Sequence, residues 1–439
     1  MIEDDVLFGR QVPLEGPPQL PNVVAQPAIK RVGQRQQCQR CWQWLRPQDQ
    51  LPNGTWYCRQ CLQMGRLTSQ HKLYTISEPN RFSMLAKSPL TWSGQLSAQQ
   101  RTAAQDVMTQ MRAQHNHLLW AVTGAGKTEI VYPALAWALQ RGWRVAWASP
   151  RVDVCLELAP RLRQAFQAIT QTVLYGDQLE PYRYCQLTIC TTHQLLRFKA
   201  AFDWVIVDEV DAFPLAMSPL LQEAIQHAQK ASGSHLYLTA TPDERLQRQV
   251  ARHQLTVTYV PLRYHGHLLP QIQVQVTWQW RRRLQRRGLP AVVLRQIQHF
   301  LTERRPFLIF VPHVADLVLV ERALKLAGIS GGATVHASDP ERQTKVQAMR
   351  DQQLTFLVTT TILERGVTFP GIAVLILGGD DPIFSTAALV QIAGRVGRSS
   401  QDPTGSVICY CQTHTQTIRA ARGMIARLNW QGRRQGGQP

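Results

Sequence analysis

One short segment of the sequence carries residues suited to binding a phosphate. Residues 121–128 follow an apolar stretch and open a helical pattern. Gly124 and Gly126 allow a tight turn that points backbone N–H groups at an anion, at the positive end of a helix. Lys127 would reach the β- and γ-phosphates of a nucleotide, and the Thr128 hydroxyl would ligate Mg²⁺. The residues expected to hold the nucleotide are Ala121, Val122, Thr123, Gly124, Ala125, Gly126, Lys127 and Thr128. The first of these stands where the usual pattern has glycine.

A pair of carboxylates follows a second apolar stretch, at residues 205–211. Asp208 would hold Mg²⁺ through water, and Glu209 would polarise the water that attacks the terminal phosphate. An acidic pair after a strand is common by itself, because helices often begin with acids. Behind a phosphate loop it predicts ATP hydrolysis. We expect Lys127, Asp208 and Glu209 to be catalytic, and Thr128 and Asp208 to ligate magnesium.

Four of the nine cysteines form two Cys-x-x-Cys pairs, Cys38 with Cys41 and Cys58 with Cys61. The sixteen residues between the pairs are typical of a zinc knuckle or ribbon, in which two turns supply four thiolates. Because four thiolates leave no open position, this zinc would be structural. Aromatic side chains beside the pairs would shield the site or stack on bases. The other five cysteines fall in apolar segments and are expected to be core residues.

Further segments follow in a fixed order. Residues 238–242 read Leu-Thr-Ala-Thr-Pro, and residues 391–398 read Gln-Ile-Ala-Gly-Arg-Val-Gly-Arg. Together with the phosphate loop and the acidic box, this ordered set resembles that of superfamily-two helicases and translocases. The resemblance implies that ATP lies between two lobes. Arg398, with Arg395, would act there as a catalytic arginine finger on the γ-phosphate.

The same resemblance implies roles for other residues. Gln100 matches the glutamine that reads the adenine base, and Gly366 lies in a second-lobe segment assigned to the nucleotide. Arg151 and Thr192 match segments of the first lobe that touch the nucleic-acid backbone. Thr360 matches the corresponding segment of the second lobe.

A four-cysteine module followed by two such lobes resembles the ComFA family of competence proteins. The likeness runs from about residue 38 to the end of the chain and is strongest at the acidic box and at residues 360–366. It implies an ATPase that drives incoming single-stranded DNA through a membrane channel during natural transformation. The implied partners are single-stranded DNA, the competence channel and other late-competence proteins, and an oligomer remains open. The implied cofactors are ATP, Mg²⁺ and Zn²⁺.

Two alternatives stay open at this point. A primosomal replication-restart or repair helicase would share the lobes, but it carries a larger zinc insertion in its second lobe, where residues 271–439 hold only Cys409 and Cys411. A non-enzymatic zinc-bearing nucleic-acid adaptor would need a degenerate motor. That alternative is weakened because the catalytic residue types are all present.

Charge adds a prediction about location. The 439 residues carry a net charge of +19, and residues 271–439 hold 21 basic and 10 acidic residues. Such an excess favours a partner made of phosphates. The densest run includes Arg281, Arg282 and Arg283 beside Trp278 and Trp280, which suits a phosphate strand but equally a solvated helix face. We expect a bound strand to press more on the second lobe than on the first.

Nothing in the sequence predicts export. The acidic N-terminus leads into no apolar run, and no stretch approaches the roughly 18 apolar residues of a membrane span. Paired cysteines beside an odd total favour a reducing compartment. We expect a cytoplasmic protein that reaches the inner face of a membrane through partners.

The elements that position these residues follow from periodicity. Short apolar runs alternate with amphipathic helical patterns, which predicts parallel strands buried on both faces. The expected fold class is α/β, with two RecA-like parallel-sheet lobes of the P-loop NTPase type behind a small zinc module. The expected divisions are a flexible leader (1–35), the zinc module (36–66), the first lobe (67–265), a basic connector (266–290), the second lobe (291–432) and a frayed tail (433–439).

Overall fold

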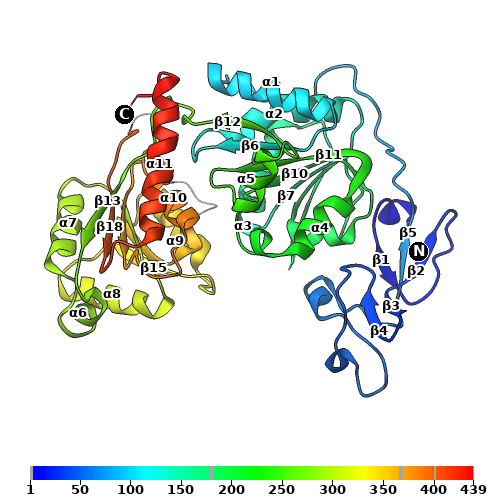
Figure 1. The fold of residues 1–439 in the computed structure, drawn as a ribbon, viewed down its shortest axis with the longest axis horizontal. Coiled ribbons are helices and arrows are strands. Elements are labelled where there is room, and N and C mark those ends of the chain that lie inside the picture. The colour runs from blue at the N-terminus through cyan, green and yellow to red at the C-terminus, as the bar shows by residue number, and fades with distance from the viewer. Residues whose placement is uncertain (1–2, 177–180, 365–368, 400–401, 439) are drawn as a thin grey trace. The chain divides into compact units, whose positions relative to one another are not determined.

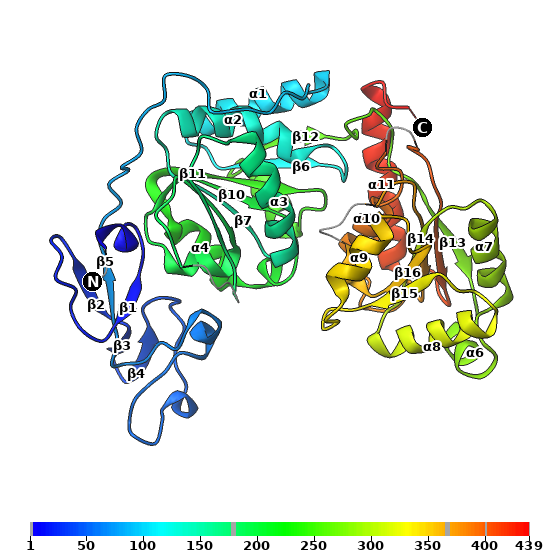
Figure 2. The same cartoon turned by 180° about the vertical axis from the view of Figure 1, so that it is seen from behind.

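The computed structural model describes residues 3–176, 181–364, 369–399 and 402–438. The chain divides into two compact units. The first comprises Met1–Trp120 and Thr128–Thr258, and the second comprises Ala121–Lys127 and Tyr259–Pro439. Each unit is built around a parallel sheet (Figures 1 and 2). Within the described residues, no helix has both the length and the apolar character needed to cross a membrane.

The first sheet has seven strands in the order β12-β6-β11-β10-β7-β9-β8. Its strands are β6 (His117–Ala121), β7 (Val145–Ser149), β8 (Gln171–Leu174), β9 (Leu187–Thr191), β10 (Phe202–Asp208), β11 (Gln229–Thr239) and β12 (Thr256–Val260). Its helices are α1 (Ala98–Arg112), α2 (Lys127–Gln140), α3 (Val152–Ala165), α4 (Pro219–Ala228) and α5 (Glu244–Ala251). Both β7 and β9 are buried at every position, because helices cover both faces of a parallel sheet.

The second sheet has six parallel strands in the order β13-β18-β17-β14-β16-β15. Its strands are β13 (Ile272–Val276), β14 (Phe307–Phe310), β15 (Gly332–Val335), β16 (Phe356–Thr359), β17 (Ala373–Leu377) and β18 (Val407–Cys411). Its helices are α6 (Trp280–Arg287), α7 (Ala291–Thr302), α8 (Val314–Leu326), α9 (Arg342–Arg350), α10 (Thr386–Ala393) and α11 (Gln416–Arg434). The predicted α/β class with two RecA-like lobes is confirmed.

Residues 266–290 differ from the connector that the sequence suggested. Strand β13 pairs with β18 inside the second sheet, and α6 buries Trp280 and Leu284 in the second core. Ile272 of this edge strand is buried but Val276 is 61% exposed, and the strand lacks the continuous apolar run that is typical of a strand covered on both faces.

The two ends of the chain are also more ordered than expected. Helix α11 continues to Arg434, and the backbone N–H of Leu268 donates to Gln438 O at 2.9 Å. Near the N-terminus, the leader contributes β1 (Val12–Leu14), β2 (Val24–Pro27) and β3 (Ile29–Val32), which pair with β4 (Arg35–Cys38) and β5 (Lys72–Thr75). The leader composition did not predict these strands, because the partner of β1 and β2 lies far along the chain.

The four-cysteine module (36–66) packs on the first lobe as part of the first unit. The Trp42 ring of the module lies edge-on to the His227 ring of the lobe, with centroids 4.7 Å apart, and the Arg197 guanidinium donates to Met64 O at 3.0 Å. Beside the module, the Arg144 guanidinium and the Glu78 carboxylate form a fully buried ion pair. Arg144 also donates to the Tyr182 hydroxyl at 2.5 Å, and the Tyr184 hydroxyl donates to Glu78. Cysteines of the module share one core with Phe198 and Phe202 of the lobe. The module therefore has a fixed position on the first lobe.

Candidate nucleotide and zinc sites

The phosphate loop connects β6 to α2, and α2 begins at Lys127 as predicted. Gly124 and Gly126 have φ angles of +81° and +74°, which side chains with a Cβ rarely adopt. The backbone N–H of Ala125 donates to Val122 O at 3.1 Å and closes the turn. The side chain of Lys127 is half-buried, and Thr128 is buried at the start of the helix. The loop thus has the geometry that its sequence demands.

A segment after β12 lies against this loop within the second unit. The N–H of Tyr264 donates to Gly124 O at 2.9 Å, and a Cβ on Gly124 would lie 3.6 Å from Arg263 Cγ. Arg263 is buried and donates to Gly397 O. Burial and the nearby Arg398 charge lower the pKa of Arg263. No motif in the sequence pointed to Arg263, because its place beside the loop depends on the pairing of distant segments.

The acidic box forms at the carboxyl end of β10. Asp208 is 9% exposed, and the Glu209 N–H donates to Asp208 Oδ1 at 2.8 Å. Glu209 has a φ of +55°, a strained conformation that is frequent at functional sites. Both carboxylates therefore lie at the edge of the sheet where parallel α/β folds bind ligands.

Asp211 joins this box to the Thr-Ala-Thr segment that ends β11. The Thr239 and Thr241 hydroxyls donate to the two Asp211 carboxylate oxygens, each at 2.5 Å. The N–H of Thr241 donates to Thr239 Oγ1 at 2.9 Å. All three residues lie in motifs of the sequence, but the motifs did not reveal that they form one network. Neighbouring parallel strands β10 and β11 bring them together.

Gln100, which was predicted to read the adenine base, helps to cap the start of α1. Gln100 is buried in α1, where its Oε1 accepts from the Ser97 N–H at 2.8 Å. In return, the Gln100 N–H donates to Ser97 Oγ at 3.3 Å. This capping box fixes the start of the helix and orients the Gln100 side chain. Gly366, the other predicted nucleotide residue outside the loop, lies outside the described residues.

The predicted nucleic-acid residues differ in exposure, and the burial of the Thr192 side chain rules out the strand contact expected of it. Arg151 is the half-buried residue before α3, and Thr360 is half-buried just after β16. Thr192 begins a short 3-10 helix, Thr192–Arg197, and its side chain is fully buried. Arg281 is bound bidentately to Asp316, at 3.0 and 2.9 Å, whereas Arg282 and Arg283 are exposed.

Arg395 and Arg398 lie in the turn that follows α10. Arg395 is 2% exposed, and its Nε donates to Glu364 O at 3.0 Å. Arg398 is half-buried, and its Nε donates to Gly394 O at 3.2 Å. A Cβ on Gly394 would overlap Thr123 Oγ1 of the phosphate loop, which explains why this turn requires glycine. Within the second unit, the arginine turn therefore lies against the loop.

The four paired cysteines converge at one buried point. Their sulfurs lie within 4.8 Å of one another, with Cys38 and Cys61 3.9 Å apart and Cys41 and Cys58 3.4 Å apart. A tetrahedral zinc–thiolate centre with bonds of about 2.3 Å has sulfurs about 3.8 Å apart. The donor set and its spacing therefore fit Zn²⁺.

Arg40 accompanies this cluster and was not predicted from the sequence. It is 1% exposed, and its Nε donates to Cys61 Sγ at 3.4 Å. Hydrogen bonds with the other three cysteines, together with the Arg40 charge, lower the pKa of Cys61. The thiolate is the form that binds a metal. A position inside a Cys-x-x-Cys turn did not single out Arg40, because Arg59 lies in the other such turn and is instead exposed and paired with Asp49.

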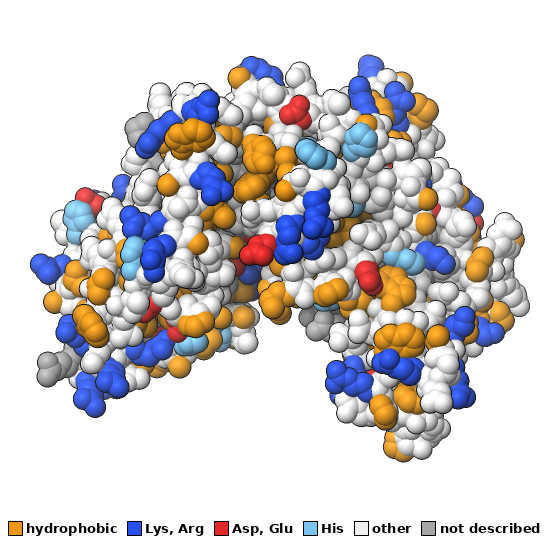
Figure 3. Space-filling view, viewed as in Figure 1, with side chains coloured by type: hydrophobic (Ala, Val, Ile, Leu, Met, Phe, Trp, Pro, Cys, Tyr) orange, Lys and Arg blue, Asp and Glu red, His pale blue; other side chains and the backbone are white. Residues whose placement is uncertain are grey.

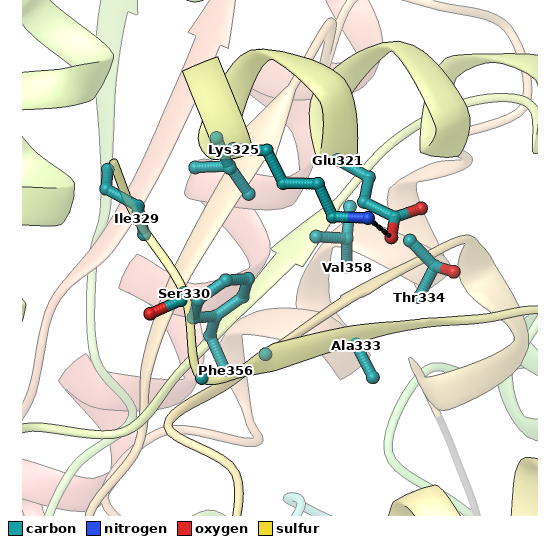
Figure 4. A pocket seen from close by; sticks show the side chains of 11 residues that line it. Glu321, Lys325, Ile329, Ser330, Ala333, Thr334, Phe356 and Val358 are labelled. Carbon is teal, nitrogen blue, oxygen red and sulfur yellow. Dashed lines mark hydrogen bonds and ion pairs between the residues drawn. The ribbon is translucent and has the colours of Figure 1, made fainter. Parts of the chain in front are cut away.

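A small pocket of about 130 Å³ lies in the second unit between α8, β15 and β16 (Figure 4). The Lys325 ammonium over this pocket donates to Glu321 at 2.8 Å, so its charge is already paired. None of the lining residues belongs to the predicted sites.

Three segments of the chain match described families. Residues 19–75 match the competence protein ComFA N-terminal domain, residues 97–249 the DEAD/DEAH box helicase family, and residues 292–400 the helicase conserved C-terminal domain. Competence protein ComFA of Bacillus subtilis is 40% identical over 93% of this chain and 88% of that relative. Competence protein ComFA of Streptococcus pneumoniae is 36% identical over 92% of each chain. The chain belongs to the ComFA family.

The ComFA assignment confirms the resemblance drawn from the motifs and the zinc module. The helicase matches make this ComFA relative a helicase-like ATPase, which implies ATP and Mg²⁺. A solved structure of Mycobacterium smegmatis helicase Lhr bound to ssDNA and AMP-PNP shares the fold, with a TM-score of 0.55 and 20% identity. That likeness covers 79% of this chain and 51% of the Lhr chain.

Proposed function

We propose that this ComFA-family protein hydrolyses ATP in response to single-stranded DNA and moves along that strand. The observation that carries the proposal is the Asp211 network, in which the acidic box and the Thr-Ala-Thr segment share one carboxylate. A shift in the positions of Asp208 and Glu209 on nucleotide binding would move Asp211, and through its hydrogen bonds would move the end of β11 and the following helix α5. A nucleotide site joined in this way to a neighbouring strand and helix supports a motor rather than a simple binding module.

The roles of the site residues follow from their chemistry. Lys127 and the loop N–H groups bind the phosphates, and Thr128 and Asp208 hold Mg²⁺, which neutralises charge on the phosphate oxygens. Glu209 orients and deprotonates the attacking water. Arg395 and Arg398 stabilise the negative charge that develops on the transferred group. Gln100 and Gly366 complete the nucleotide contacts.

Strand binding and cellular role are further parts of the proposal. Arg151, Thr360 and the exposed arginines of α6 contact the DNA backbone, whereas the fully buried Thr192 side chain supports the segment behind them. In natural transformation the motor would draw incoming single-stranded DNA through a membrane channel, docked at the inner face of the membrane by late-competence partners. The names of the two ComFA relatives support this role. The zinc centre has a structural task, since all four of its ligands come from the protein.

The test is ATP turnover by the full chain without nucleic acid and with single-stranded DNA, duplex DNA or RNA. We expect stimulation by single-stranded DNA and a loss of at least about a hundredfold in Lys127→Ala, since transition-state charge contacts contribute about 3 kcal/mol or more. Lys199→Ala, which removes an exposed lysine of the same lobe, is the matched control and should retain wild-type turnover.

Equal turnover with and without single-stranded DNA would refute the proposal, as would an active Lys127→Ala variant. Efficient unwinding of a forked duplex would instead favour a replication-restart or repair helicase. ATP binding with no turnover under any condition would favour a nucleic-acid adaptor.

A further inference from the structure

Helix α11 carries a concentration of positive charge that none of the motifs explains. Its nineteen residues contain no aspartate or glutamate. They include five arginines, Arg419, Arg422, Arg427, Arg433 and Arg434. The helix therefore holds nearly half of the excess charge of residues 271–439, although its arginines are spaced and form no obvious run in the sequence.

The spacing places all five arginines on one face. At about 100° per residue, they fall within an arc of about 140° around the helix. All five are exposed. The opposite face is buried and consists of Ile418, Ala421, Ile425, Leu428, Asn429 and Gly432. Figure 1 shows α11 on the viewer's side of the second sheet, and Figure 3 shows basic side chains gathered in that part of the surface.

The helix is held firmly by its buried face. Asn429 exchanges two hydrogen bonds with the backbone of Leu269, at 2.9 and 2.8 Å. A Cβ on Gly432 would overlap Leu262 and Leu268, so the helix packs closely on these residues. The arginine face is therefore presented on a rigid support, as a binding surface requires.

The exposed face of α11 carries guanidinium groups and an aromatic ring, and no carboxylate among the described residues pairs with these guanidinium groups. Within the described part of the chain, none of the five arginines forms an ion pair with a carboxylate. Trp430 is 56% exposed in the middle of this face, with the Arg434 guanidinium 4.8 Å from its ring. Arginines around an exposed indole are the combination that binds single-stranded nucleic acid, through phosphate contacts and base stacking.

A lipid surface fits these observations less well. A helix that binds membranes lays a free apolar face into the headgroup region. The apolar face of α11 is already buried in the lobe, and its outer face offers one large apolar side chain, Trp430. A nucleic-acid strand requires only the face that is available.

We propose that the arginine face of α11 is a binding site for single-stranded nucleic acid, with Trp430 stacking on a base. From Arg419 to Arg433 the face is about 21 Å long, over which a strand passes on the order of three to six phosphates. The identity of the strand as DNA rests on the proposed function. The site itself adds a contact region outside every helicase motif identified in the sequence.

The experiment measures binding of fluorescent oligo(dT) and of an RNA of the same length to the full chain by anisotropy, without ATP, at several salt concentrations. The test variant is Arg419→Gln with Arg427→Gln and Arg433→Gln. The matched control is Arg295→Gln with Arg304→Gln and Arg322→Gln, which removes three exposed arginines from the same unit. Thermal melting checks that each variant is folded.

The α11 variant should bind at least about tenfold more weakly, and its slope of log affinity against log salt should be shallower by about 2, at about 0.7 per lost phosphate contact. Trp430→Ala should weaken binding about fivefold to tenfold without changing the slope, and Trp430→Phe should restore most of it. The control variant should match wild type.

Wild-type affinity and slope in the α11 variant would overturn the inference, as would a wild-type chain that binds no oligonucleotide. Binding to anionic phospholipid vesicles is measured for the same variants. If the α11 variant lost vesicle binding but bound oligonucleotide like wild type, the inference would also be overturned, in favour of lipid. If the chain binds oligonucleotide through α11 but its ATP turnover is not stimulated, the proposed function fails and this site stands.

Discussion

Arg144 in the first compact unit and Arg427 on α11 in the second carry the same guanidinium in opposite surroundings. Arg144 is fully buried and contacts Glu78 and Tyr182, which come from segments far apart in the chain. Arg427 is exposed on a face without carboxylates. A buried arginine with partners holds parts of a protein together, whereas an exposed one without partners is available to a ligand. The comparison teaches that arginine content alone does not locate a phosphate-binding surface.

The largest expected effect is on the free energy of unfolding when the buried Arg144 is replaced. Arg144→Met leaves the Glu78 carboxylate buried without its cation, which costs about 3–5 kcal/mol of unfolding free energy. Arg427→Met should change the unfolding free energy by less than about 0.5 kcal/mol, because the side chain is exposed. Urea denaturation of both variants measures the difference. Equal stabilities would contradict the distinction.

Zinc retention tests a second buried arginine. Arg40→Met removes the hydrogen bond to Cys61 Sγ and should weaken zinc binding about 10–100-fold, as for other partners of metal ligands. The readout is zinc transfer to a chromogenic chelator. Arg66→Met, an exposed arginine of the same module, is the control. A wild-type transfer rate in Arg40→Met would show that the cation is dispensable.

Lowering the pH should reduce the free energy of unfolding of the first unit, because this unit contains buried histidines. Burial lowers the pKa of His117, His227 and His235 to about 4, and all three lie in the first unit. In the unfolded chain each protonates near a pKa of about 6.5, so stability falls as the pH drops from about 6.5 to 4 and is unaffected above that window. Each histidine should cost about 2 kcal/mol at pH 5.

The measurement is the unfolding free energy of wild type and His117→Gln at pH 7 and pH 5. His117 bonds Thr256 and Thr258, so the variant should be less stable at pH 7 but lose less on acidification. His115→Gln, an exposed neighbour, should keep the wild-type dependence. An identical pH dependence in His117→Gln would exclude this residue as a source.

The smallest expected effect concerns the arginines of α6. Arg282→Glu with Arg283→Glu should weaken oligonucleotide binding and reduce its salt slope by about 1.4, if each contacts one phosphate. Arg281→Gln should instead act mainly on stability, because Arg281 binds the nearly buried Asp316. Unchanged affinity and slope in the double variant would remove α6 from the strand path and sharpen its contrast with α11.

Much of the fold followed from local patterns. Strands such as β9 and β17 agree with the predicted alternation, because a continuous apolar run between helices is typical of a strand buried on both faces. Strand β13 and the leader strands were not predicted, since edge strands and short antiparallel strands depend on their partners.

The sequence by itself determined the chemistry of the two main sites. A phosphate loop and a Cys-x-x-Cys turn are local structures, so Gly124, Lys127, Cys38 and Cys61 could be recognised from neighbours along the chain. The tertiary structure alone decided which charged groups have partners. The contacts of Asp211 with Thr239 and of Arg40 with Cys61 join segments that meet only in the folded chain. The arginine face of α11 is likewise available only because the folded chain brings no carboxylate of the described residues against it. Partners determine whether a charge stabilises the fold or remains available to a ligand.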